Sequence, residues 1–179
     1  VAQGDVSPGL LADLDRLIGR LRAEAGIDIS RTAQAAEGEN VIAVEFLPRR
    51  QMQAVVPAAA CFVVPNVSNW AEFAANRRSP VIDWTRVTQR QRAVVFVPWD
   101  TTPQEIRDCL HEEIAQALGP LNDLFRLPDS IFNDDNFQTT LTGFDMLILR
   151  VWNAPELTPG MTREQVAARL PTLFNRMNP

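Results

Sequence analysis

The chain of 179 residues contains no lysine and no tyrosine, one histidine and two cysteines. The absence of lysine excludes a Schiff-base enzyme, a Walker A phosphate loop and a serine–lysine dyad, because each needs an ammonium group. A single histidine excludes zinc sites with two histidine ligands, and two cysteines exclude a site of four thiolates. A serine triad would have to use His111, and no Gly-x-Ser-x-Gly motif is present to supply its nucleophile.

Basic residues are outnumbered by acidic ones, with 17 arginines against 22 aspartates and glutamates, and the net charge is -5. We therefore expect no nucleic-acid partner. No apolar run approaches the roughly 20 residues that cross a bilayer, so no transmembrane segment is expected. The first residue is Val1 rather than Met, which is consistent with removal of a signal or lipid anchor upstream. Length and a 46% hydrophobic content predict one domain over residues 1–179.

Hydrophobic patterning predicts a mixture of helices and strands. Leucines and isoleucines at helical spacing predict an amphipathic helix from Pro8 to near Gly26. Three β-branched segments predict strands at residues 40–47, 61–64 and 93–97. Residues 66–92 are polar but contain several aromatic side chains, so we expect a packed excursion rather than a linker.

Three capping motifs predict three further helices. The motifs begin at Thr102, Thr142 and Thr162, and the helices are expected at 103–118, at 143–153 and from 162 towards the C-terminus. The second helix is almost wholly apolar, which predicts burial. The third is expected to bend or break at Pro171.

The 103–118 helix carries the candidate chemistry. Glu113 falls near the middle of its apolar face, where a carboxylate is costly unless it is paired. Glu112 and Gln116 are four residues apart on one flank, so their side-chain oxygens converge, whereas His111 projects to the opposite flank. The alternatives are a solvated Glu112, a structural Glu113 bonded to backbone amides or an arginine, and a partly exposed His111. After the turn at Gly119, residues 122–123 bring further oxygen donors near.

Residues 112–122 (EEIAQALGPLN) resemble the metzincin zinc-protease motif, His-Glu-x-x-His-x-x-Gly-x-x-His/Asp. Glu112, Gln116 and Asn122 stand at the three ligand positions, and Glu113 stands at the position of the general base. Residues 130–132 occupy the place of the methionine turn, and residues 141–152 look like the closing helix. The resemblance implies a zincin-like α+β domain with a small twisted mixed sheet, an active-site-type helix, a buried C-terminal helix and a motif-bearing core at about 91–165.

The same stretch also resembles a proteobacterial domain family of unknown function, through LHEE-x-x-QALG, a following ND and the segment Ser-Ile-Phe-Asn-Asp. Many members of that family look like lipoproteins or exported proteins. This resemblance implies a periplasmic location or attachment to the outer membrane, and it brings no known activity.

The ligand positions predict little affinity for zinc. One carboxylate and two amides at Glu112, Gln116 and Asn122 are weak zinc ligands, so we expect no stoichiometric zinc. With Asp123 nearby, the same oxygen donors favour calcium, magnesium or manganese.

The two cysteines, Cys61 and Cys109, are too far apart in sequence for a CxxC motif. The residues alone leave open a disulfide or two small core side chains. Cys61 opens a predicted strand and Cys109 lies near the buried face of the 103–118 helix, so we expect the two to be close if the sheet packs on that helix. The resemblance to exported proteins implies that they form a disulfide.

Two classes of function follow from these observations. The first is an exported binding or scaffolding module that has lost zinc peptidase chemistry and takes a peptide or an envelope protein by strand addition in the former cleft. The second is an unconventional metal- or carboxylate-dependent hydrolase of peptides or glycans, with Glu113 as general base.

Overall fold

In the computed structural model, the described residues are 2–3, 7–35, 38–133, 135–136 and 138–177. They contain a small mixed sheet of four strands in the order β1-β2-β4-β3. The strands are β1 (Ala2–Gln3), β2 (Val41–Leu47), β3 (Phe62–Pro65) and β4 (Arg92–Pro98). The first two pair in parallel with each other and β2 pairs in parallel with β4, whereas β3 is antiparallel at the edge. The fold is therefore mixed α and β.

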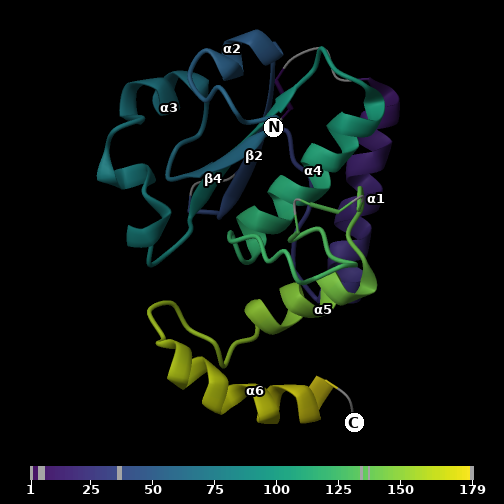
Figure 1. The fold of residues 1–179 in the computed structure, drawn as a ribbon, viewed down its shortest axis with the longest axis vertical. Helices are drawn as coiled ribbons and strands as arrows, with labels where there is room; N and C mark the ends of the chain where they lie inside the picture. Colours follow the sequence, from purple (N-terminus) through teal and green to yellow (C-terminus); the bar gives the residue numbers. More distant parts are fainter. Residues whose placement is uncertain (1, 4–6, 36–37, 134, 137, 178–179) are drawn as a thin grey trace.

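The central strand, β4, explains why the sheet is covered on both faces. Residues 93–98 are all buried, so side chains of both faces need a partner. Ala93, Val95 and Val97 point towards α1 (Pro8–Ala25) and α4 (Pro103–Leu118). Val94 and Phe96 point towards α2 (Arg49–Gln53) and α3 (Trp70–Asn76). Figure 1 shows these two helix pairs on opposite sides of the sheet.

The excursion between β3 and β4 is packed, as expected. It contains α3 and two short 3-10 helices, η1 (Pro80–Ile82) and η2 (Trp84–Arg86). The rings of Trp70 and Phe73 gather around Phe62 and Phe96 with centroids 5.1–6.5 Å apart. This aromatic cluster joins α3 to the sheet.

The capping residues of the sequence begin their helices where expected. Thr102 and Thr142 each form a capping box, and Thr162 exchanges hydrogen bonds with Gln165 at the start of α6 (Arg163–Met177). A bend or break was expected at Pro171, and the break is wrong, because α6 continues through this residue as one helix. None of the helices in the described ranges is long and apolar enough to cross a membrane.

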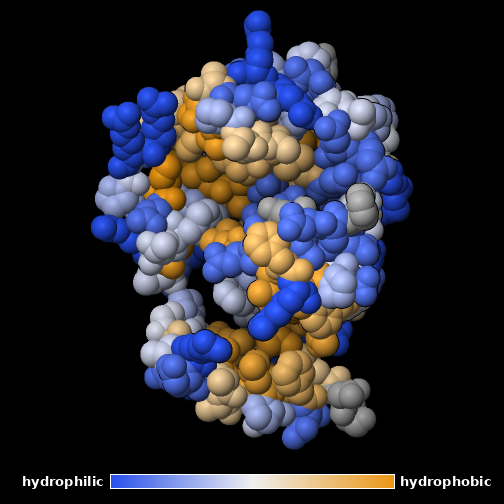
Figure 2. Space-filling view, viewed as in Figure 1, coloured by the Kyte–Doolittle hydropathy of each residue, from blue (hydrophilic) through white to orange (hydrophobic). Residues whose placement is uncertain are grey.

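The apolar composition of α5 (Gly143–Trp152) predicted a fully buried helix, but only one of its faces is buried. One face, with Met146 and Leu149, is buried, while Phe144, Leu147 and Trp152 are exposed. The cause is its position, because α5 packs on α1 from one side (Figure 1). Figure 2 shows apolar residues gathered in the lower part of the molecule, where α5 and α6 lie.

Candidate functional site

A pocket of about 400 Å³ opens between edge strand β3 and helix α4. Its lining comes from β3, η2, α4 and the turn after α4, and consists of Cys61, Phe62, Val63, Trp84, Glu112, Glu113, Gln116, Leu121, Asn122 and Asp123. The structure thus brings together the candidate residues that the sequence placed on the helix and in the following turn. Cys109 lies behind this wall, in the core.

The two glutamates of the pocket differ in environment. Glu113 is 4% exposed, whereas Glu112 is half-buried and accepts a hydrogen bond from the Gln116 amide at 3.4 Å. One carboxylate oxygen of each glutamate and the Cys61 Sγ lie within 4.8 Å of one another. Adjacent helical positions therefore present two acids to the same small volume.

A disulfide joins Cys61, just before β3, to Cys109 on α4, with α-carbons 5.8 Å apart. That separation lies within the usual range for disulfides. Closing a loop of 48 residues stabilises the fold by about 4 kcal/mol in the chain-entropy description. The bond fixes edge strand and helix together one turn before Glu112.

Trp84 covers part of the edge of β3. Its indole N–H donates to the Val63 carbonyl at 3.3 Å, on the side of the strand that faces away from β4. Pro65 removes a further donor from the same short strand. A peptide that added to β3 as a new strand would have to displace the Trp84 indole.

His111 stays outside the pocket, as its helical angle predicted, but its expected partial exposure is wrong. It is 7% exposed, and its Nδ1 accepts a hydrogen bond from the Leu141 N–H at 3.1 Å. Burial, followed by the nearby Arg20 and Arg107, lowers its pKa to about 4. Arg20 also donates to the Leu141 carbonyl, so both backbone groups of Leu141 are fixed.

Arg90 caps the C-terminal end of α4, a role that the sequence did not reveal. Its Nη1 donates to three carbonyls, those of residues 116, 117 and 119, at 2.9–3.2 Å. The guanidinium lies 6.0 Å from the Trp84 ring and 5.9 Å from the Trp152 ring. Positive charge at a helix C-terminus is favourable, and Arg90 replaces a left-handed glycine cap there.

The segment after α4 is held by buried side-chain hydrogen bonds. Ser130 donates to Asp145 at 2.6 Å, and both residues are fully buried. The Asn133 amide donates to the carbonyls of Phe125 and Leu127. Phe125 itself is 68% exposed, close in sequence to Asp123 of the pocket wall. Residues 122–123 are thereby carried on an anchored segment.

The metzincin ligand set does not fit a tightly bound zinc here. Gln116 donates an amide N–H to Glu112, and Asn122 is exposed. One carboxylate and two neutral amides supply fewer strong donors than the three protein ligands of a catalytic zinc site. We therefore derive no chemistry through zinc at Glu112, Gln116 and Asn122.

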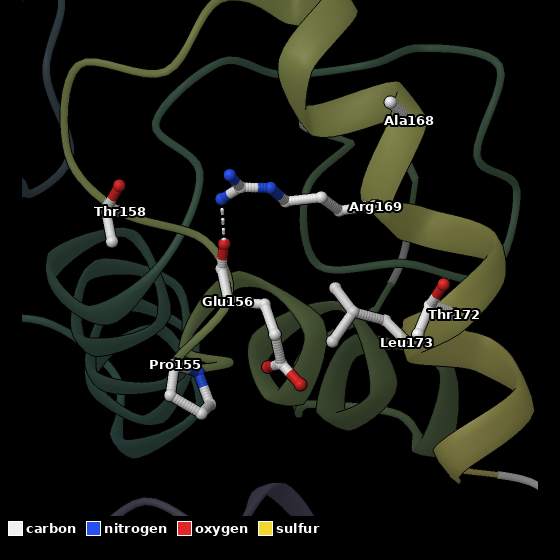
Figure 3. Close-up of a pocket in the computed structure, with 7 residues that line it drawn as sticks. All are labelled: Pro155, Glu156, Thr158, Ala168, Arg169, Thr172 and Leu173. Carbon is white, nitrogen blue, oxygen red and sulfur yellow. Dashed lines mark hydrogen bonds between the residues drawn. The ribbon is translucent and has the colours of Figure 1, made fainter.

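A second pocket, of about 330 Å³, lies between α6 and the segment that precedes it. Figure 3 shows Arg169 of α6 reaching across to the Glu156 carbonyl, with Leu173 on the same side of the helix. Glu156 also forms an ion pair with Arg176 at 2.6 Å. These polar groups bond to one another, and we assign the pocket a structural role in holding α6.

The family described as "Protein of unknown function (DUF2927)" matches residues 2–172, and the chain belongs to this family. The match covers the sheet, the pocket and most of α6. No curated protein and no solved structure matches the chain.

Proposed function

We propose that the protein is an exported binding module whose pocket between β3 and α4 takes a positively charged segment of a peptide or envelope protein. A zincin-like origin that has lost its peptidase chemistry is part of the proposal. The observation that carries it is the charge of the pocket. Glu112, Glu113 and Asp123 line it, and none of its described lining residues is basic.

Charge complementarity gives this pocket a preference. Three carboxylates in a partly desolvated volume attract lysine, arginine or a peptide amino terminus and repel acidic segments. Phe62, Val63 and Leu121 supply apolar wall on which the methylene stem of a basic side chain packs. The occupant we favour is therefore long and cationic.

Export is supported by the disulfide between Cys61 and Cys109. Disulfides persist in oxidising compartments and are rare in the cytosol. A periplasmic or outer-membrane location fits both this bond and the export implied by the sequence resemblance.

Strand addition at β3 is the mode of binding that the sequence suggested, and Trp84 makes it testable. A segment that pairs with β3 displaces the indole from the Val63 carbonyl, which changes the surroundings of the ring. A side chain that enters the pocket without adding a strand leaves this hydrogen bond in place. Tryptophan fluorescence is measured on adding peptide to wild type and to Trp84→Phe. A fluorescence change that is present in wild type and absent in the variant comes from Trp84 and indicates strand addition. No Trp84-dependent change indicates a side chain that enters the pocket alone.

The test is a calorimetric titration with two model peptides of equal length, one alternating lysine and alanine, the other alternating glutamate and alanine. We expect the lysine peptide alone to bind, with weakening at high salt. Glu112→Gln should weaken binding by about 5-fold, the value of about 1 kcal/mol for one partly exposed charge pair.

Glu164→Gln on α6 is the matched control, because it removes the same charge at an exposed position outside the pocket lining. It should leave the affinity unchanged. Equal binding of both peptides, or equal weakening by both substitutions, would refute the proposal.

A second candidate function rests on the closeness of Glu112 and Glu113, with carboxylate oxygens within 4.8 Å of each other. Paired acids at such separations serve as acid and base or as nucleophile in hydrolases, and oxygen donors also suit calcium, magnesium or manganese. In this reading, Glu113 acts as base on a peptide or glycan. Turnover of envelope peptides or glycans that disappears in Glu113→Gln, with folding intact, would favour it over the binding module.

A further inference from the structure

We propose that reduction of the Cys61–Cys109 disulfide creates a site for a thiophilic divalent metal such as zinc, formed by Cys61, Glu112 and Glu113. This set differs from the metzincin ligand positions, because it uses the edge strand and a thiolate in place of Gln116 and Asn122. It does not depend on the proposed binding function.

The geometry places three donors of two kinds around one point. Cys61 Sγ and one oxygen from each of Glu112 and Glu113 lie within 4.8 Å of one another. The described part of the chain contains one such group of three His, Cys, Asp or Glu side chains. Tetrahedral zinc ligands are about 3.5 Å apart, given bonds of about 2.0 Å to oxygen and 2.3 Å to sulfur. Rotations of two glutamate side chains supply an adjustment of about 1 Å.

The pocket offers space and access for the metal. All three donors line the same 400 Å³ opening, and Cys61 and Glu112 are half-buried rather than sealed. Gln116 and Asp123 line it as well, so a further oxygen donor or a water molecule can complete the coordination.

The disulfide blocks this site in the oxidised protein, since a disulfide sulfur carries no negative charge and is a poor ligand. A dithiol reductant supplies two electrons and two protons, the Sγ–Sγ bond breaks, and the reductant leaves as its own disulfide. Metal binding then releases the proton of the Cys61 thiol and forms the metal–sulfur bond. The metal balances two of the three negative charges that the ligands bring together.

The thiolate sets the selectivity. Sulfur ligands favour zinc, cadmium and cobalt over calcium and magnesium, whereas the carboxylates alone would favour the hard ions. The oxidised and reduced forms therefore differ in the kind of metal they bind as well as in affinity. Metal binding therefore depends on the redox state of the Cys61–Cys109 pair.

The test uses two variants that both remove the disulfide but leave different thiols. Cys109→Ser keeps the Cys61 thiol beside Glu112 and Glu113. Cys61→Ser keeps only the thiol of Cys109, which is not one of the three proposed ligands. Both lose the same loop closure, and because Cys109 is buried whereas Cys61 is half-buried, the folding of each variant is checked by circular dichroism. Each is titrated with cobalt(II), whose thiolate complexes have a charge-transfer band in the near ultraviolet, and then with zinc.

We expect Cys109→Ser to bind one metal ion with a thiolate-to-cobalt band, at least about 100-fold more tightly than Cys61→Ser. Glu112→Gln in the Cys109→Ser background should weaken the binding. Wild-type protein provides an independent measurement, with no band when oxidised and a band after reduction by a phosphine that is then removed. Equal affinities of the two cysteine variants, or no band in folded reduced protein, would overturn the proposal.

Discussion

Lowering the pH should destabilise the fold through His111, and the effect can be isolated. The folded-state pKa of His111 is about 4, against an ordinary value of 6.5, because burial and two arginines disfavour the imidazolium. In the unfolded chain His111 binds its proton at a pH about 2.5 units higher than in the folded protein. Stability is therefore lost as the pH falls from about 6.5 to about 4, and the full shift corresponds to about 3 kcal/mol.

The structural consequence of protonation lies at Leu141. The imidazole Nδ1 accepts from the Leu141 N–H, and an imidazolium has no lone pair left for this bond. The positive charge also lies near Arg20 and Arg107, with Asp13 as the opposing acid. We expect the segment that leads into α5 to loosen first, because its backbone is fixed between His111 and Arg20.

The assay is urea unfolding of wild type and His111→Asn at about pH 7.5 and about pH 4.5. The asparagine side-chain oxygen takes the place of Nδ1 without titrating, so the variant should lose about 2 to 3 kcal/mol less than wild type over this interval. His111→Leu leaves the Leu141 N–H without an acceptor and should cost about 1–3 kcal/mol relative to wild type at about pH 7.5. Because leucine does not titrate, this difference should shrink or reverse at about pH 4.5, where wild type has lost stability.

The comparison between wild type and variant is needed because other groups also titrate. Burial raises the pKa of Glu45 and of Asp108, and these acids favour folding as the pH falls, in opposition to His111. They contribute equally to wild type and variant. Identical pH dependence of wild type and His111→Asn, or an imidazole pKa near 6.5 measured by NMR, would refute the reasoning.

Other predictions concern close packing at the end of α4, a glycine on α1 that serves as its contrast, and a buried hydrogen bond in the segment after α4. Gly119→Ala should cost about 1–3 kcal/mol in urea unfolding, because its Cβ would lie 2.6 Å from Leu149 Cδ2. Gly19→Ala on α1 meets no atom within 4 Å and should instead stabilise by up to about 1 kcal/mol, and a loss there would contradict this. Ser130→Ala removes a buried donor to Asp145, and we expect a cost of about 1–3 kcal/mol in thermal unfolding.

Local patterns explain why α4 was predictable to the residue. Thr102 and Glu105 form the capping box within four residues of sequence, and helical periodicity then places Glu113 on the buried face. The convergence of Glu112 and Gln116 follows from the same periodicity. All of this is specified by neighbours along the chain.

Contacts between distant segments were not predictable in the same way. Arg90 reaches the end of α4 from a polar stretch that resembles any other, and no spacing pairs it with Gly119. His111 and Leu141 are 30 residues apart, and their hydrogen bond depends on how α4 and the segment before α5 pack. The apolar sequence of α5 indicated a need for burial, but the available neighbours cover only one of its faces.

The way in which α4 is fixed decides how the charge variants of the pocket can be interpreted. The disulfide at Cys109 holds α4 to the edge strand, and Arg90 holds its C-terminal carbonyls. Neither of these two contacts ends on the Glu112 or Glu113 side chain, so replacing a glutamate by glutamine removes a charge of the pocket while both attachments of α4 remain. A change in peptide affinity in Glu112→Gln then reports electrostatics. Cys61→Ser and Cys109→Ser both lack the covalent link between β3 and α4, so only the difference between these two variants isolates the metal ligand.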